Sequence, residues 1–385
     1  MTTVIDAAKN GALQILEELI HAKADISEKD DQHGRTALVW AVLCDQRSCV
    51  ELLINAKADM ETRDRDGNTA LLWAISKGHV QCAELLVSAQ ADVNIWHNDS
   101  TTALMWAVRD GNIECAKLLV DARADINALN VSGETALAFA VDGEHVALTQ
   151  MLVDAQADIE TTDHSDRTAL MRAACTQPLS VLVLLDAKAS IETATENGWT
   201  ALMWAAWSNR FTCVQLLLDA RASVVSCNSE GETALILASQ VGDPACVQLI
   251  LDAKAEIQAR DSDGTTSLMW AVRIGNTECV QLLINAKSDV DAVNHDGRTA
   301  LLEAVSRRHT ASAKLLVDFK ADVEAKDKDG WTALMWAATG GAAALVEQLI
   351  NANASTLAEN NAGEHALMHA ARHGNIACLR LLLER

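Results

Sequence analysis

The sequence of 385 residues contains no tyrosine and only two prolines, and aromatic residues make up 3% of it. So few prolines exclude proline-rich linkers. No window approaches the 18 uninterrupted apolar residues typical of a membrane-spanning helix. The N-terminus has Asp6 and Lys9 close together and no apolar run of signal-peptide length. We therefore expect a chain that is neither secreted nor membrane-spanning, located in the cytoplasm or the nucleus.

The signatures of common enzyme classes are also absent. The chain has no glycine-rich phosphate-binding loop, no Gly-x-Ser-x-Gly nucleophile turn and no kinase signature. The sequence therefore predicts a protein that is not an enzyme and needs no cofactor.

Basic residues are scarce relative to acidic ones. The 31 lysines and arginines stand against 53 aspartates and glutamates, which gives a formal net charge of −22. Such a chain repels phosphate backbones and anionic lipids, so we expect neither nucleic acid nor membrane as a partner. The acidity is typical of a soluble, elongated surface, and it also favours a basic partner protein.

What the chain has in abundance is repetition. The phrase Gly198–Ala206 recurs unchanged at Gly330–Ala338, and degraded copies of it fill the rest. A fixed period of about 33 residues is typical of a stacked-repeat solenoid, in which each unit buries its apolar face against its neighbours. The threonine of this phrase returns every 33 residues, with one interval of 32, and His365 stands in the same frame: Thr36, Thr69, Thr102, Thr135, Thr168, Thr200, Thr233, Thr266, Thr299 and Thr332.

The repeat from Thr102 to Thr135 illustrates the expected local structure. Thr102 suits a helix N-cap, and a short helix of small residues follows it. Gly111 interrupts that helix, and a polar turn ending at Gly133 precedes the next threonine. Between them, a second helix has an apolar stripe with helical spacing at Cys115, Leu118, Leu119 and Ala122.

This arrangement resembles the ankyrin-repeat family over essentially the whole chain. The family pattern of Asp-x-x-Gly-x-Thr-Pro-Leu-His, Ala-Ala, Gly-His, Leu-Leu and Gly-Ala-Asp is matched in frame eleven times, with alanine in place of the proline. The resemblance implies an all-α solenoid of helix–turn–helix units with protruding hairpin-like loops, stacked into a curved array with a concave groove. It also implies a scaffold that binds another protein, and we expect the chain to be a monomer.

The frame divides residues 1–385 into the parts of a single solenoid. Residues 1–29 supply an N-terminal capping helix pair, residues 30–364 the regular repeats, and residues 365–385 a C-terminal capping repeat. The unit at about 163–195 is irregular, because Pro178 lies in a helix–helix turn that is one residue shorter than elsewhere. Either the loop tolerates the deletion, or the deletion bends the stack and shapes the groove.

The family's glycine at the end of the second helix is replaced in every repeat, mostly by a cation. If the backbone there keeps a positive φ, each replacement costs about 1 kcal/mol, and a cation at that end of the helix dipole returns roughly 0.3–1 kcal/mol. Because the backbone strain and the helix-dipole stabilisation nearly cancel, we expect the fold to tolerate these replacements. The residues are Lys23, Lys57, Gln90, Arg123, Gln156, Lys188, Arg221, Lys254, Lys287, Lys320 and Asn353.

Seven of the ten cysteines lie thirteen residues after the threonine frame. Equivalent positions in stacked helices are about 8–10 Å apart, beyond the roughly 7 Å Cα limit for a disulfide. These cysteines are therefore predicted to be small buried hydrophobes. They are Cys49, Cys82, Cys115, Cys213, Cys246, Cys279 and Cys378.

A column of mostly aromatic residues lies four positions after the threonine frame, and its regularity predicts a core role. Three members are polar, and a lone charge cannot be buried without a cost of several kcal/mol. The column must therefore lie near an accessible edge, or the three polar members must have partners. The column consists of Trp40, Trp73, Trp106, Phe139, Arg172, Trp204, Leu237, Trp270, Glu303, Trp336 and His369.

Tryptophans that the repeat does not require predict the partner site. The resemblance places the residue before the threonine and the end of the first helix on the concave groove, and exposed tryptophan often dominates protein interfaces. The alternative is incidental packing against a neighbouring loop. The candidate tryptophans are Trp199, Trp207 and Trp331, and the arginines of the same surface class are Arg35, Arg109, Arg273 and Arg298.

Two weaker hypotheses concern other residue types. His365, His369 and His373 share one helical face, but the outer two lie about 12 Å apart, so one zinc ion cannot bind all three. A metal site at His369 and His373 therefore remains a remote alternative to ordinary polar cap residues. The segments around Asn94 and Asn127 resemble the ankyrin pattern whose asparagine can be hydroxylated. A further alternative is that the chain is the recognition region of a larger enzyme or channel.

Overall fold

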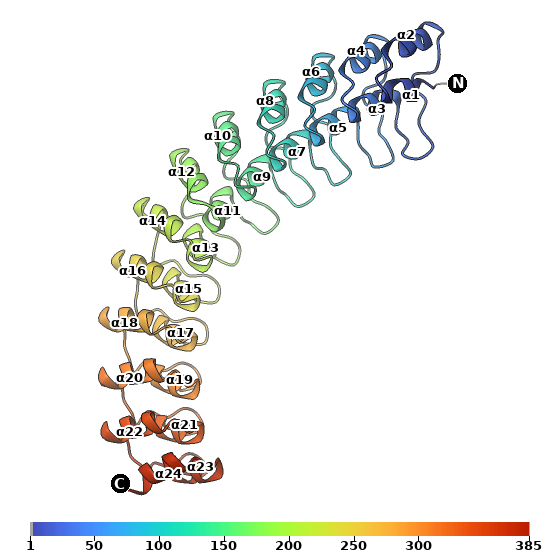
Figure 1. The fold of residues 1–385 in the computed structure, drawn as a ribbon. Coiled ribbons are helices and arrows are strands. Elements are labelled where there is room, and N and C mark those ends of the chain that lie inside the picture. The colour runs from blue at the N-terminus through green and yellow to red at the C-terminus, as the bar shows by residue number, and fades with distance from the viewer. Residues whose placement is uncertain (1–2, 385) are drawn as a thin grey trace. The chain divides into compact units, whose positions relative to one another are not determined.

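The computed structural model describes residues 3–384, which form twenty-four α-helices and no β-strand (Figure 1). Helices alternate between a first and a second helix of each repeat, and a loop leads to the next pair. Isolated antiparallel bridges close four of these loops, pairing Trp96 with Thr102, Ala194 with Thr200, Cys227 with Thr233, and Arg260 with Thr266. The predicted all-α repeat fold with hairpin-like loops is confirmed.

The chain divides into two compact units, residues 1–190 and 191–385, and the boundary falls within the irregular repeat. The first unit contains α1 (Val4–Lys9), α2 (Leu13–His21), α3 (Ala37–Leu43), α4 (Arg47–Asn55), α5 (Ala70–Ser76), α6 (Val80–Ser88), α7 (Ala103–Arg109), α8 (Ile113–Asp121), α9 (Ala136–Asp142), α10 (Val146–Asp154), α11 (Ala169–Thr176) and α12 (Pro178–Asp186). The second unit contains α13 (Ala201–Trp207), α14 (Phe211–Asp219), α15 (Ala234–Val241), α16 (Pro244–Asp252), α17 (Ser267–Ile274), α18 (Thr277–Asn285), α19 (Ala300–Ser306), α20 (Thr310–Asp318), α21 (Ala333–Gly340), α22 (Ala343–Asn351), α23 (Ala366–Arg372) and α24 (Ile376–Leu383).

Each regular first helix begins at the threonine of the repeat frame. The threonine hydroxyl accepts a hydrogen bond from the backbone N–H three residues later, for example from Met105 to Thr102 at 3.3 Å. A cap of this kind contributes about 1 kcal/mol. In the last repeat His365 occupies the position and makes no side-chain cap bond. That repeat therefore lacks one of the local interactions that fix the others.

Within each unit the helices form two layers. First helices pack on the first helices of adjacent repeats, as α3 does on α1 and α5, and second helices pack on second helices in the same way. In Figure 1 the loops lie on the side of the first helices, and the second helices form the opposite side of each unit. Functional side chains on the first helices therefore share one face with the loops.

The shortened turn of the irregular repeat is absorbed at the start of α12. Only Gln177 separates α11 from α12, and Pro178 is the first residue of α12. Proline suits this position, because its ring presets φ and the missing N–H would have no partner within the helix.

The residue that replaces glycine after the second helix has a positive φ in the eleven repeats that contain it, with values from 58° at Lys23 to 69° at Lys287. The condition stated above for a strained backbone is therefore met at all eleven positions. Each replacement carries the strain of a Cβ atom in the left-handed region, about 1 kcal/mol relative to glycine.

Small apolar side chains build the core between the layers. The seven cysteines of the repeat frame are all buried, as predicted, beside alanine and leucine side chains. Burial raises the pKa of the Cys82 and Cys279 thiols to about 12, which keeps them protonated and unreactive at neutral pH.

Hydrogen bonds also link successive loops. In eight loops a side chain six residues after the end of the second helix accepts the backbone N–H of the equivalent loop in the next repeat, as Asn94 does from Asp125 at 2.7 Å and Asn127 from Asp158 at 2.9 Å. The asparagines singled out for their modification pattern therefore have a structural role between repeats.

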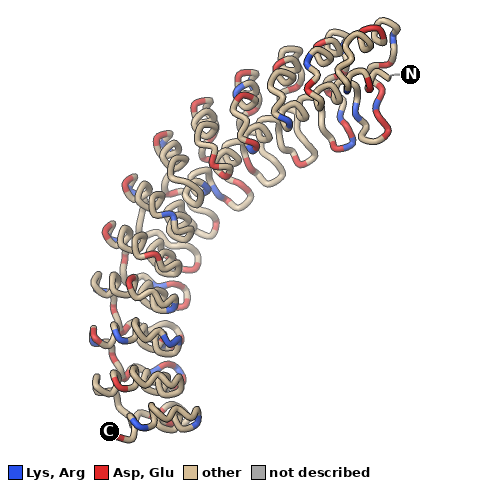
Figure 2. Tube along the Cα trace, in the orientation of Figure 1, with Lys and Arg blue, Asp and Glu red and all other residues tan. Residues whose placement is uncertain are grey.

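Acidic residues are spread over loops and second helices, whereas basic residues recur at the ends of several first helices (Figure 2). Within residues 3–384, no helix combines the length and apolar character needed to cross a membrane.

Candidate protein-binding face

We define the first-helix face as four positions of each repeat: the residue before the threonine frame and the residues four, seven and eight positions after it. The residue four positions after is the column described above. In four repeats a column tryptophan donates its indole N–H to an aspartate in the preceding loop, nine or ten residues earlier. These pairs are Trp40 with Asp30 at 2.6 Å, Trp73 with Asp64 at 2.8 Å, Trp270 with Asp261 at 2.8 Å, and Trp336 with Asp327 at 3.2 Å.

Where the column residue cannot donate in this way, the loop carries asparagine instead of aspartate. Asn130 precedes Phe139, and Asn228 precedes Leu237. The asparagine amide then donates to a glutamate four residues later, at 3.0 Å from Asn130 to Glu134. A carboxylate is thus kept in this half-buried position only where a donor faces it, because an unpaired buried charge is costly. Trp106 and Trp204 lack the aspartate, and their indole N–H groups have no acceptor.

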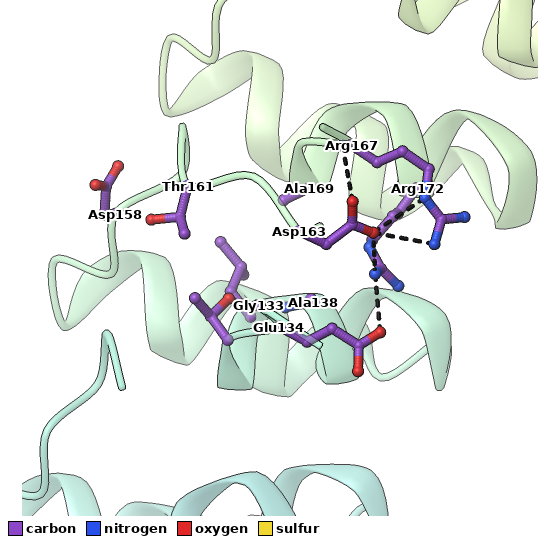
Figure 3. Close-up of a pocket in the computed structure, with 11 residues that line it drawn as sticks. Gly133, Glu134, Ala138, Asp158, Thr161, Asp163, Arg167, Ala169 and Arg172 are labelled. Atoms are coloured by element: carbon purple, nitrogen blue, oxygen red, sulfur yellow. Dashed lines mark hydrogen bonds and ion pairs between the residues drawn. The ribbon is translucent and has the colours of Figure 1, made fainter. Parts of the chain in front are cut away.

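Arg172 is the basic member of the column, and its side chain is 4% exposed. Its guanidinium donates to Glu134 at 2.9 Å, to Asp163 at 2.5 Å, and to Asp142. Figure 3 shows Glu134, Asp163 and Arg172 converging from the loops and α11, with Arg167 also paired to Asp163. Burial opposes ionisation of Asp163, but backbone hydrogen bonds and the charges of Arg172 and Arg167 hold its pKa below the usual value. The adjoining cavity, about 10 Å³, is too small for a ligand.

Glu303 is the acidic member of the column and is 1% exposed. Arg273 Nη2 and Arg307 Nε each donate to its carboxylate at 3.0 Å, and Arg298 Nη1 lies 4.0 Å away. Burial opposes ionisation, but the hydrogen bonds from Arg273 and Arg307 prevail and lower the pKa of Glu303. Glu303 therefore reverses the arrangement at Arg172, with one carboxylate among three guanidinium groups.

His369 is the third polar member, buried at 1% exposure. Its ring stacks on Trp331 with centroids 4.2 Å apart, and its Nε2 lies 3.5 Å from a Glu364 carboxylate oxygen. Burial lowers the pKa of His369. Nowhere in the described part of the chain do three or more His, Cys, Asp or Glu side chains gather as a metal site would require. Arg172 and Glu303 thus have charged partners, whereas His369 Nε2 makes no hydrogen bond.

The candidate tryptophans pack against the column. Trp199 lies 4.6 Å from Trp204 between ring centroids, and Trp207 stands edge-on to both at 6.2 Å. Trp331 lies 4.6 Å from Trp336 in the same way. Trp207 is 51% exposed, whereas Trp199 and Trp331 are half-buried. Each of these two residues stands at the end of a loop, just before the threonine, and its ring packs against the column tryptophan of the same repeat.

The candidate arginines lie over column tryptophans. Arg35 lies over both the Trp40 and Trp73 rings, at 5.2 and 4.8 Å from the centroids. Its Nε also donates to Asp64 at 3.2 Å. Arg109 lies over Trp106 at 5.6 Å and remains half exposed. These cation–π contacts hold the guanidinium groups on the first-helix face.

The remaining two arginines belong to the Glu303 cluster. Arg273 lies 4.8 Å from the Trp270 centroid and Arg298 5.3 Å from that of Trp336. The sequence prediction did not include Arg307, because its arginines stand one residue before or seven residues after the frame threonine and Arg307 lies eight after it. The chance to pair with Glu303 four residues earlier was the available signal.

Trp96 presents a second aromatic surface, away from the first-helix face. It lies at a loop, is 53% exposed, and helps to line an open cavity of about 350 Å³ with Asn94 and Leu129. Arg63 lies 5.8 Å from its ring centroid and donates to its carbonyl oxygen.

Comparison with known proteins identifies the same repeats. The sequence model described as "Ankyrin repeats (3 copies)" matches residues 4–97, 91–163, 160–229, 235–327 and 313–385. Over 54 residues the chain is 43% identical to Inversin of Gallus gallus and 41% identical to Inversin of Homo sapiens, a match that covers 14% of this chain. The chain spans about 5% of the length of these curated relatives.

Among solved structures, the ankyrin repeat domain of Bcl-3, described as a unique member of the IkappaB protein family, is similar in sequence at 27% identity. The match covers 65% of this chain and 99% of that domain, with a TM-score of 0.49.

Proposed function

The chain belongs to the ankyrin-repeat family, and on that premise we propose that it is a non-catalytic scaffold that binds a partner protein through its first-helix face and the adjoining loop tips. The family's repeats generally serve protein interaction. The observation that carries the proposal is the cluster of Trp199, Trp204 and Trp207, in which a half-exposed indole is held by two others.

Rigid aromatic anchors lose little conformational entropy on binding. Trp207 contacts two neighbouring rings edge-on, so its rotamer is fixed before any partner arrives. Trp199 is required neither as a cap nor as a core residue of the repeat, and the same is true of Trp331. Tryptophan and arginine are the residues that most often dominate interface energies. Arg273 and Arg298, which lie over column rings, belong to the proposed surface of the second unit, and Arg35 and Arg109 hold the same positions in the first unit.

The test compares capture of the native partner by the wild type and by two aromatic variants. We expect Trp207→Ala to weaken capture at least tenfold, because interface tryptophans commonly contribute more than about 1.4 kcal/mol. Phe319→Ala is the matched control, since Phe319 is 44% exposed but lies at the end of the second helix α20, away from the first-helix face. Equal capture by Trp207→Ala and wild type, with unchanged helicity, would remove the site assignment.

Three finer features belong to the same proposal. The net charge of −22 supports a basic partner surface wherever loops and second helices are contacted. A monomer in the cytoplasm or nucleus fits a scaffold of this kind, and light scattering on the purified chain measures the oligomeric state. The alternative is that these repeats supply recognition to a larger enzyme or channel, which the transcript sequence beyond Arg385 decides.

A further inference from the structure

The carboxylate of Glu303 is surrounded by an excess of cations. We call Arg273, Arg298 and Arg307 the arginine triad; together with Glu303 the group has a formal charge of +2. Each guanidinium has five N–H donors, and one carboxylate offers about four acceptor sites. Besides the Glu303 carboxylate, the described residues offer the triad guanidinium groups one further acceptor: Ser306 Oγ, at 3.5 Å from Arg298 Nη1. The buried Nε of Arg273 has no acceptor at all. The triad is therefore rich in unused donors.

The charge around the triad is opposite to that of the chain as a whole. On the first-helix face of the last four repeats, which begin at Thr266, Thr299, Thr332 and His365, four arginines stand against two glutamates. That gives +2 for this face, against −22 for the full chain. The preceding loops carry Asp261, Asp263, Asp296, Asp327 and Asp329, and Asp261 and Asp327 accept from the column tryptophans Trp270 and Trp336, so the positive charge is confined to a narrow strip along the helices. Figure 2 shows basic residues at the ends of α17 and α19, where the strip lies.

Aromatic rings fix the orientation of the triad. Arg273 lies over Trp270 and Arg298 over Trp336, which leaves their guanidinium planes little freedom. Pre-ordered guanidinium groups pair well with carboxylates, because fewer rotamers are lost per hydrogen bond. The fold itself does not require this cation excess. The equivalent column position of the first unit holds Arg172 among three carboxylates, an excess of the opposite sign.

From these observations we propose that the arginine triad binds an acidic segment of a partner protein, through carboxylates that take up its unused donors. The proposal rests on the proposed function, because it names the partner chemistry for part of the same first-helix face. It also limits the expectation of a basic partner to the acidic loops and second helices.

The three arginines form one site. Arg273 Nη2 and Arg307 Nε each lie 3.0 Å from a carboxylate oxygen of Glu303, and Arg298 Nη1 lies 4.0 Å away. A partner segment would therefore meet the triad at a single place, with one carboxylate or with neighbouring carboxylates.

The experiment uses the full chain and a fluorescein-labelled peptide of Glu-Ala-Pro repeats, followed by fluorescence anisotropy at low and physiological salt. We expect saturable binding that weakens as salt is raised. A Gln-Ala-Pro peptide of the same length should bind less tightly, and a Lys-Ala-Pro peptide should not bind at the triad. Because the chain is strongly acidic, non-specific attraction predicts the reverse order.

Arg307→Gln is the informative variant, since the Arg307 side chain is 48% exposed and its removal leaves Arg273 on Glu303. We expect about a tenfold loss of peptide affinity. Arg167→Gln is the matched control: it neutralises a similarly exposed arginine beside the Arg172 cluster and should leave affinity unchanged.

Three results would overturn the proposal: no saturable binding of the Glu-Ala-Pro peptide, unchanged affinity in Arg307→Gln, or preference for the lysine peptide. Binding of a phosphoserine-Ala-Pro peptide alone would overturn the assignment of a carboxylate ligand. The proposed function is tested separately, because loss of native-partner capture in Trp207→Ala does not depend on the peptide. If the Glu-Ala-Pro peptide does not bind but capture of the native partner still depends on Trp207, the triad proposal is refuted and the proposed function is not.

Discussion

Replacing Arg172 with methionine removes the one column cation that faces three carboxylates. Removing one partner of a buried ion pair costs about 3–5 kcal/mol, because the charge that remains has lost its compensation. Asp163 is that charge, with a side chain only 5% exposed, whereas Glu134 and Asp142 retain more contact with water. Arg167 and two backbone N–H groups still pair with Asp163 in the variant, so its compensation is lost only in part. We therefore expect Arg172→Met to lower the stability of this region by about 3 kcal/mol, the lower end of that range.

Arg172→Trp is the sharper comparison. A tryptophan here would have the same nine-residue relation to Asp163 that Trp73 has to Asp64 and Trp270 to Asp261, both with hydrogen bonds of 2.8 Å. A hydrogen bond to a charged group contributes about 1.5–3 kcal/mol. We therefore expect Arg172→Trp to recover roughly half of the loss caused by methionine, although both variants lack the cation.

Hydrogen exchange followed by mass spectrometry suits the measurement, because the stability of a repeat array is not a single global quantity. The relevant peptides cover α9 and α11. The pH dependence provides a second check. The lowered pKa of Asp163 means that its stabilising contribution is complete above its unfolded pKa of about 3.9 and is lost as the pH falls through the lower folded value. The deficit of Arg172→Met should therefore shrink at acid pH.

Two results would refute this reasoning. One is an Arg172→Met protein within about 0.5 kcal/mol of the wild type, the size of an ordinary surface substitution. The other is an Arg172→Trp protein that opens more readily than the methionine variant, which would mean that the loop aspartate does not act as an acceptor for the column.

The same measurements check three further predictions. Lys57→Gly and Lys254→Gly remove the strain of a Cβ atom at positive φ and should each raise the free energy of unfolding by about 0.5 kcal/mol. This value is the strain removed minus the helix-dipole stabilisation that the lysine provides. A lower stability in either variant would contradict the prediction. Trp73→Phe should lower the free energy of unfolding by about 1.5 kcal/mol, because it removes the donor to Asp64. Adding Asp64→Asn should restore part of that stability. A double variant no more stable than Trp73→Phe would contradict the pairing of a loop aspartate with a column donor. Because burial lowers the pKa of His369, the wild type should lose stability in urea as the pH falls from about 6.5 through that lower value, whereas His369→Phe should not; equal pH slopes would argue against it.

Periodicity and capping chemistry were sufficient to predict the fold. The threonine frame located the start of every regular first helix, and the departures from the family pattern after the second helices identified eleven of the residues with positive φ. These features are local, so the residues that cause them stand next to the structure they cause. The requirement that Arg172, Glu303 and His369 find partners followed from the cost of buried charge alone.

The identity of those partners was harder to predict, because they lie in other repeats. Arg273 reaches Glu303 across thirty residues, and Trp331 stacks on His369 across thirty-eight. The half-burial of Trp199 has the same origin, since it depends on how its ring meets Trp204. Such contacts depend on the stacking of one unit on the next, which the repeat period by itself does not specify.

The pairing of each column residue with the loop before it defines what can be exchanged as one piece. A module cut at the threonine would separate Trp270 from Asp261, leaving a carboxylate in one piece and its donor in the next. A module cut just after the second helix keeps both. Duplication, deletion or grafting of repeats in this chain should therefore succeed at the second-helix boundary and fail at the threonine. The segment of this architecture that can be exchanged intact is a loop followed by two helices.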